Sequence, residues 1–357
     1  MSDRGGCDYD LKRWAIDWRF GKADVRASAA MLWECEFLLP SGRTFQPFAH
    51  APWADDPALD PGLPAHLRHL GGEFVCVPFG IGGRPQDLLP EWESGAWKQV
   101  NASPHGLSSD APWNLISADA THVSLRLPYP DDDDIEFLTR RIAAVPDAPA
   151  LDLELAIHVR RPTRQPLGLH PILRLPEAPA ELVIESAFEF GMTYPAVVPP
   201  GISRVAPGRR FTRLESVPGM DGGTIDYARL PKDTPTEEML MLCGIRAPVT
   251  VHYPSERAAF RLSWDTKLLP SCLLWPSDRS VAEPPWNRRF RGLGVEPIAA
   301  LFDAGRDLTL ERNPINAAGI ATSVAIVPGQ PLVTRYRIEA LEANAFSAVP
   351  RIADLSA

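Results

Sequence analysis

Two histidines and one glutamate stand beside glycine or proline at three separate places in the chain. His170 lies in the proline-flanked stretch 166–176, His105 precedes a glycine, and Glu296 precedes a proline. A carboxylate accepts protons near neutral pH, whereas histidine, with an unperturbed pKa of about 6.5, can return them. These residues therefore predict general acid–base chemistry on a small polar molecule.

Glu296 is the candidate base. Gly292 and Gly294 allow a close approach of the backbone to a ligand, and the apolar neighbours Val295 and Pro297 partly desolvate the carboxylate. Burial raises the pKa of a carboxyl group toward a working value. The alternative, from the residues alone, is a surface carboxylate near a turn.

His105 and His170 differ from the other six histidines in their surroundings. His105 lies in a loop of proline, serine and glycine, and His170 ends a short apolar strand before Pro171. By contrast, His158 alternates with aliphatic residues, which indicates a structural or surface role. Any single histidine has this alternative, so the prediction rests on the grouping.

The sequence lacks the motifs of several other reaction classes. It has no HxH or HExxH pair for zinc and no Gly-x-Ser-x-Gly elbow for a serine nucleophile. The glycines at 80–83 lead to Pro85 and not into a helix, which disfavours a phosphate or dinucleotide cradle. The five cysteines are far apart, without a CxxC pair, and are expected to be reduced. We therefore expect neither a metal nor a cofactor.

The elements that must position the candidate residues are expected to be strands. The chain of 357 residues contains 38 prolines, which disfavour helix interiors. In 151–159 every second residue is a large aliphatic, while Asp152, Glu154 and His158 share the other face, a pattern typical of a half-buried antiparallel strand. Similar runs are expected at 8–21, 29–39, 44–50, 72–79, 114–118, 122–127, 136–145, 182–190, 249–253, 258–264, 271–275, 320–327 and 332–340.

These spacings predict an all-β fold, a large antiparallel β-sandwich. Helix-like windows are short, such as 236–242. We expect one domain over residues 25–342, with an N-terminal extension, 1–24, packed on it and a C-terminal tail, 343–357.

Charge and hydropathy exclude further classes of protein. The net charge of −9 and the pI near 5.4 would repel a nucleic acid backbone. The first residues, Met-Ser-Asp-Arg-Gly-Gly-Cys, lack the basic region and apolar run typical of a signal peptide, and no later run approaches the roughly 18 apolar residues of a membrane-spanning helix. We therefore expect a cytoplasmic monomer or homodimer without nucleic acid or membrane partners.

Five segments, in this order, resemble motifs of the aldose 1-epimerase (galactose mutarotase-like) superfamily. The similarity spans residues 25–342 and depends on the colinear order of the segments. They are Leu70–Gly80, Ser103–Leu115, Leu167–Pro171, Leu269–Trp275 and Gly294–Pro297.

The resemblance implies a β-supersandwich with a sugar-binding cleft on one concave sheet. It also implies that Glu296 removes the anomeric hydroxyl proton of a sugar while His170 protonates the ring oxygen. The ring then opens and recloses on the other face. His105 would be a second histidine that hydrogen-bonds the substrate.

The resemblance suggests further substrate-binding residues. Arg84 is the candidate arginine, and the substrate-binding aspartate is Asp226 or Asp221. Trp275 and Trp113 are candidates for stacking on a sugar ring, with burial in the core as the alternative. After His170 the family continues with an aromatic residue and often Asn, whereas this chain reads Pro-Ile-Leu-Arg. We expect its sugar specificity to differ accordingly.

Three functions stay open at this point. The first is a cofactor-independent sugar epimerase, in one variant acting on a sugar phosphate gripped by Arg84, Arg174 or the arginines of 288–291. The second is a non-catalytic carbohydrate-binding protein. The third is a hydrolase or lyase, ranked last because hydrolysis needs two carboxylates and only Glu296 is placed.

Overall fold

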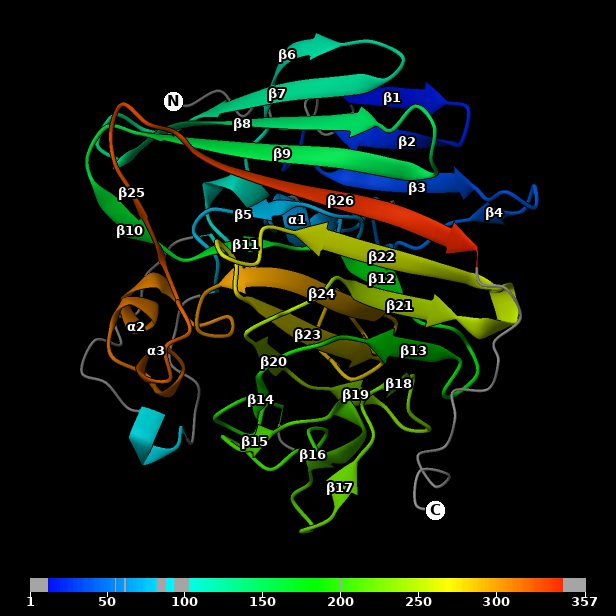
Figure 1. The fold of residues 1–357 in the computed structure, drawn as a ribbon, viewed down its shortest axis with the longest axis vertical. Helices are drawn as coiled ribbons and strands as arrows, with labels where there is room; N and C mark the ends of the chain where they lie inside the picture. The colour runs from blue at the N-terminus through cyan, green and yellow to red at the C-terminus, as the bar shows by residue number, and fades with distance from the viewer. Residues whose placement is uncertain are drawn as a thin grey trace.

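The structure is a computed structural model. It describes residues 12–54, 56–60, 62–81, 88–92, 103–199 and 201–342. Within this part of the chain the all-β prediction is confirmed, because two large antiparallel sheets dominate the molecule (Figure 1). None of the described helices is long and apolar enough to cross a membrane.

The first sheet contains the long strands that run side by side across the upper part of the view (Figure 1). All its described pairs are antiparallel. Its order is β18 (Arg229–Leu230), β13 (Leu182–Glu185), β21 (Val249–Tyr253), β22 (Ala258–Trp264), β26 (Leu332–Glu342), β9 (Ala150–Val159), β8 (Ile135–Ala144), β7 (His122–Pro128) and β6 (Asn114–Ala118).

The second sheet packs against the first. β12 (Ile172–Arg174) pairs with its strand β24, and β19 (Thr236–Glu237) pairs with β23. Its main order is β15 (Arg210–Phe211), β14 (Phe190–Thr193), β20 (Leu240–Cys243), β23 (Ser271–Asp278), β24 (Arg291–Ala299), β11 (Leu167–Leu169) and β5 (Val75–Cys76).

Smaller elements complete the described fold. β1 (Arg13–Trp18), β2 (Gly21–Arg26), β3 (Leu32–Leu38) and β4 (Thr44–Phe45) form a separate N-terminal sheet, whose Ile16 and Val25 join the core between the two large sheets. The remaining paired strands are β10 (Thr163–Gln165) with β25 (Val324–Ile326) and β16 (Val217–Pro218) with β17 (Thr224–Ile225). The helices are α1 (Ala65–Arg68), α2 (Arg306–Leu310), α3 (Pro314–Ala317), η1 (Pro90–Trp92), η2 (Leu107–Ser109), η3 (Leu214–Ser216) and η4 (Pro254–Glu256).

The first sheet explains the alternation in the sequence. In β9 the leucines 151, 153 and 155 are buried in the core, whereas Asp152 and Glu154 face outward. There they form ion pairs with Arg337 (2.6 Å) and Arg335 (2.7 Å) of β26. An antiparallel sheet with one packed and one solvated face produces this period of two.

The second sheet has no such alternation because both of its faces are covered. In β24, Leu293 and Val295 join the core between the sheets, while Ile298 joins a second apolar cluster on the far face. No strand was predicted over 291–299, since a strand buried on both faces has no polar side from which to recognise it.

Two sequence predictions are corrected here. The helix-like window 236–242 forms β19 and β20, both in the second sheet. The run 182–190 is divided between β13, in the first sheet, and β14, in the second. Apolar content alone does not predict the residue at which the chain passes from one sheet to the other.

Candidate active site

A cavity of about 490 Å³ lies on the face of the second sheet that is turned away from the first sheet. Phe74 and Leu273 line it, and both belong to the apolar cluster on that face. His105, His170, Trp275 and Glu296 also line it; the structure brings these four predicted residues together.

His170 and Glu296 come from neighbouring strands of the second sheet. His170 lies between β11 and β12, and Glu296 lies within β24, which pairs with both. The backbone N–H of Val295 donates to the carbonyl of Pro171 at 2.9 Å, which ties together the residues next to each side chain. His170 Nε2 lies 3.5 Å from Glu296 Oε1. The sheet thus places a candidate acid and base in direct contact.

The His170 ring also packs on an aromatic ring. It stacks on Phe74 at 4.5 Å between ring centroids, with 16° between the planes. The backbone N–H of His170 donates to the Phe74 carbonyl at 2.8 Å. Phe74 therefore fixes both the backbone and the ring of His170.

Gly294 makes room for the Glu296 carboxylate. Two residues apart on one strand, they share a face of the sheet. A Cβ at position 294 would lie 2.2 Å from Glu296 Oε1 and 3.1 Å from the Cβ of Trp275. The glycine predicted to admit a ligand therefore admits the carboxylate itself, and Glu296 is a buried mid-strand residue, not a surface carboxylate near a turn.

His105 is presented by a strained turn. It has a φ of +60°, and the following Gly106 has a φ of +77° with Val77 O 2.4 Å from a Cβ added there. The backbone N–H of Gly80 donates to His105 Nδ1 at 3.4 Å, which leaves the proton of the neutral ring on Nε2. The ring lies 5.1 Å from that of His170 at 83°.

A third histidine lines the cavity, and the sequence analysis missed it. His66, on the short helix α1, is buried, and its ring lies 5.6 Å from that of His105. Nothing in the local sequence distinguishes His66 from His69, three residues later. Only the packing of α1 against the loop that carries His105 brings His66 to the site.

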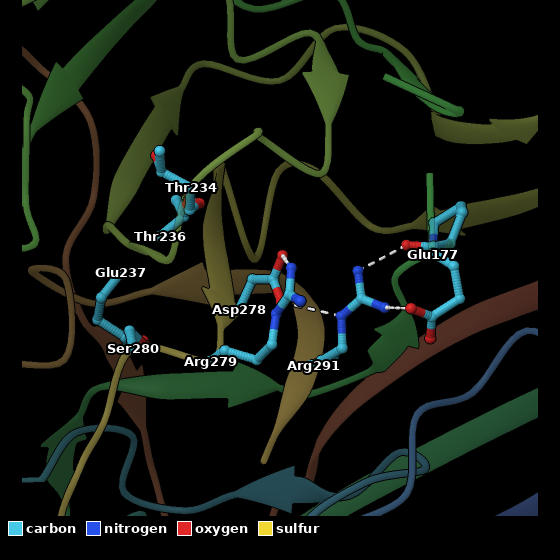
Figure 2. Close-up of polar contacts among 9 residues, drawn as sticks. Glu177, Thr234, Thr236, Glu237, Asp278, Arg279, Ser280 and Arg291 are labelled. Carbon is cyan, nitrogen blue, oxygen red and sulfur yellow. Dashed lines mark hydrogen bonds and ion pairs between the residues drawn. The ribbon is translucent and has the colours of Figure 1, made fainter. Parts of the chain in front are cut away.

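Two further carboxylates, Glu237 and Asp303, line the cavity and were also missed. Glu237 accepts a hydrogen bond from Trp275 Nε1 at 2.5 Å and another from Ser280 Oγ; Figure 2 shows Glu237 beside Ser280. Asp303 is hydrogen-bonded to Tyr194. Glu237 lies in the window 236–242, whose sequence pattern predicts a helix and does not indicate a residue that lines a cavity.

Burial controls protonation in the cavity. It lowers the pKa of His170 to about 3 and that of His66 to about 4. Burial, aided by the neighbouring histidines, holds the pKa of His105 well below 6.5. Burial also raises the pKa of Asp303 to about 6, and burial with the nearby Asp303 raises that of Glu296 well above 4.5. The uncharged forms are therefore favoured.

Two of the predicted residues, Trp113 and Asp226, are not at this site. Trp113 is buried in the core between the sheets, where its Nε1 donates to the Ser108 carbonyl at 3.0 Å. Asp226 is outside the cavity lining and accepts a hydrogen bond from the Ala228 N–H at 2.9 Å. Arg84 lies outside the described residues.

Two of the arginines considered for a phosphate, Arg174 and Arg291, have other partners. Arg291 forms ion pairs with the buried Asp278 (2.9 Å) and with Glu177 (2.6 Å), as Figure 2 shows. Arg174 pairs with Glu256 at 2.5 Å. Neither lines the cavity. Within the described ranges, no group of His, Cys, Asp and Glu is arranged to hold a metal ion.

Comparisons with known proteins agree with this architecture. No family model matches the sequence, and no curated protein is similar to it. Among solved structures, the Slr1438 protein of Synechocystis sp. PCC 6803 is similar with a TM-score of 0.62 and 16% identity, over 93% of this chain and 96% of that one.

Two further structures have nearly the same TM-score. A putative aldose 1-epimerase of Escherichia coli K12 has a TM-score of 0.61 and 13% identity, over 92% of this chain and 98% of that one. A GalM/aldose epimerase homologue of C. elegans has a TM-score of 0.61 and 13% identity, over 93% and 99%. The chain therefore has the galactose mutarotase-like fold, as its sequence motifs predicted.

Proposed function

We propose that this protein is a cofactor-independent isomerase of the aldose 1-epimerase type, which interconverts the anomers of an aldose. The observation that carries the proposal is the 3.5 Å contact between His170 Nε2 and Glu296 Oε1 at the buried end of a cavity of about 490 Å³. Structural neighbours that include a putative aldose 1-epimerase support this reaction class.

In this mechanism Glu296 takes the proton of the anomeric hydroxyl while His170 gives a proton to the ring oxygen. The ring opens, the C1–C2 bond rotates, and both proton transfers reverse as the ring closes on the other face. Burial favours the arrangement in which the proton shared by the pair sits on Glu296. Its transfer to His170 therefore precedes ring opening, and the pair titrates as one unit.

The other polar groups of the cavity bind the substrate in this proposal. His105 donates from Nε2–H to a sugar oxygen, and Trp275 offers an aromatic face to the sugar ring. Glu237, whose carboxylate is oriented by Trp275 and Ser280, accepts from a sugar hydroxyl. General acid and base steps contribute about 10²–10⁴-fold each, which suffices for a ring opening that is not very slow without an enzyme.

The test is anomer exchange, measured by NMR over a panel of aldoses and aldose phosphates. We expect Glu296→Gln and His170→Asn each to lower the rate by about 10²-fold or more while the protein stays folded. Glu154→Gln and His158→Asn are matched controls, because both residues lie in β9 outside the cavity lining. They are expected to retain the wild-type rate.

The same measurements separate the other functions. If no sugar exchanges faster with the protein while some sugars bind, the epimerase proposal is wrong and the protein is a carbohydrate-binding module. A rate advantage of phosphorylated over free sugars would identify a sugar phosphate as the substrate.

A further inference from the structure

The mouth of the cavity differs chemically from its closed end. Ile81 and Val198 line the mouth and are 49% and 38% exposed. His105, His170 and Glu296 are at most 8% exposed. A ligand that reaches the acid–base pair therefore leaves its other end among the apolar side chains.

These apolar side chains come from separate loops. Ile81 follows β5, Val198 follows β14, Met239 lies between β19 and β20, and Trp286 lies between β23 and β24. The Trp286 ring is fixed by packing on Trp53, with 5.3 Å between centroids. Four connections contribute to it, so this apolar character is shared by the loops at the mouth that the structure describes.

The side chains of Ile81, Val198 and Met239 offer a ligand no hydrogen-bonding group. A sugar hydroxyl that leaves water without finding a partner is unfavourable, whereas burial of an apolar carbon is favourable. The mouth thus discriminates against a hydroxyl at the outer end of the ligand.

We propose that the cavity takes a neutral aldose that is deoxygenated, or carries an apolar substituent, on the side of the ring away from the anomeric carbon. The orientation rests on the proposed function, which puts the anomeric carbon and the ring oxygen at His170 and Glu296. Neutrality follows because no lysine or arginine of the described residues lines the cavity and burial keeps His170 uncharged, so an anionic ligand would find no cation there.

The experiment compares kcat/KM for anomer exchange of D-glucose with those of its 2-deoxy, 4-deoxy and 6-deoxy analogues. D-galactose is compared with its 2-deoxy and 6-deoxy analogues and with the same 4-deoxy sugar, because the two parents differ only at C4. In one series at least, the 4-deoxy or 6-deoxy sugar is expected to exceed the parent by about tenfold, the effect of one well-placed apolar group. The 2-deoxy sugar lacks a hydroxyl beside the anomeric carbon and is expected to show no gain. The proposal is wrong if the distal deoxy sugars do not exceed the parents, or if 2-deoxy sugars gain as much.

Variants connect the preference to the mouth of the cavity. Val198→Asn introduces a hydrogen-bonding group there and is expected to reduce the ratio of deoxy to parent kcat/KM severalfold. Leu115→Asn is the matched control, because Leu115 is 45% exposed on β6, outside the cavity lining. An unchanged ratio in Val198→Asn overturns the assignment of the preference to this mouth.

Failure of the proposed function is distinguishable from failure of this inference. If no sugar shows accelerated exchange, the dissociation constants of the same sugars are measured by calorimetry on the wild-type protein. Tighter binding of a 4-deoxy or 6-deoxy sugar than of its parent supports the inference without catalysis. Equal or weaker binding of all of them overturns it.

Discussion

At the scale of single residues, desolvation outweighs charge pairing in the candidate site. His170 and Glu296 touch, yet burial lowers the pKa of His170 to about 3 and raises that of Glu296 well above 4.5. Removing a group from water disfavours its charged form whether it is an acid or a base. The pair therefore holds its proton without separating charge.

Because burial raises the pKa of Asp303, the stability of the folded protein depends on pH. Its pKa is about 6 in the folded protein, against about 3.9 for an unperturbed aspartate. The folded state binds this proton more tightly, so the associated stability is fully present below about pH 4 and is lost as the pH rises through about 6. The loss amounts to about 3 kcal/mol.

Asp303→Asn cannot titrate at this position and is expected to lose less stability than the wild type between about pH 4 and about pH 6. Tyr194→Phe removes a hydrogen bond that lowers the Asp303 pKa. The loss of stability of this variant is therefore expected to extend to higher pH than that of the wild type. Urea unfolding at a series of pH values measures both. Parallel pH dependences of the wild type and Asp303→Asn would contradict the prediction.

At the scale of elements, Gly294 of β24 leaves the space that the Glu296 carboxylate occupies. Gly294→Ala puts a Cβ 2.2 Å from Glu296 Oε1, so the carboxylate must leave its present position beside His170. A displacement of about 1 Å in a catalytic group can lower a rate by about 10²-fold, and we expect a loss of that order in anomer exchange by a folded variant.

Gly223→Ala is the control for Gly294→Ala. The nearest atom to an added Cβ there is Asp221 Oδ1, at 3.2 Å, at the end of a surface side chain. We expect this variant to retain wild-type activity. Full activity of Gly294→Ala would show that the position of the Glu296 carboxylate is not critical.

The elements also show why some of the molecule was predictable and some was not. β21 and β22 were predicted to the residue, because their ends coincide with turns and their patterns are local. β24 escaped prediction because it is buried on both faces. Glu237 and Asp303 lie far from His170 in sequence, and only long-range packing brings them together. The motif order revealed His105, His170 and Glu296, which the fold then brought to one cavity.

At the scale of the whole molecule, a buried ion pair crosses between the two large sheets. Arg140 of β8 contacts the carboxylate of Glu73, which lies near β5, and Tyr336 of β26 donates to the same carboxylate at 2.8 Å. All three side chains are buried. Glu73 directly precedes Phe74, so the Arg140–Glu73 ion pair holds the segment whose Phe74 ring stacks on His170.

Arg140→Met leaves the Glu73 charge buried without its cation and is expected to destabilise the fold by about 3–5 kcal/mol. Glu73→Leu combined with Arg140→Met removes both charges and is expected to recover most of that loss. Denaturant unfolding of both single variants and the double variant measures the coupling energy. A double variant as unstable as the sum of the single variants would mean that the two charges are not coupled.

The hydrogen bond from Val295 to Pro171 has a consequence for the timescale of function. The spacing of His170 and Glu296 is fixed by a backbone ladder in the interior of a sheet, a part of a protein whose opening costs up to the free energy of global unfolding. In the proposed reaction, the motions that accompany each turnover then come from the loops around the mouth, since loop rearrangements are far faster. The rate of ligand entry and release can therefore change in evolution without disturbing the chemical step.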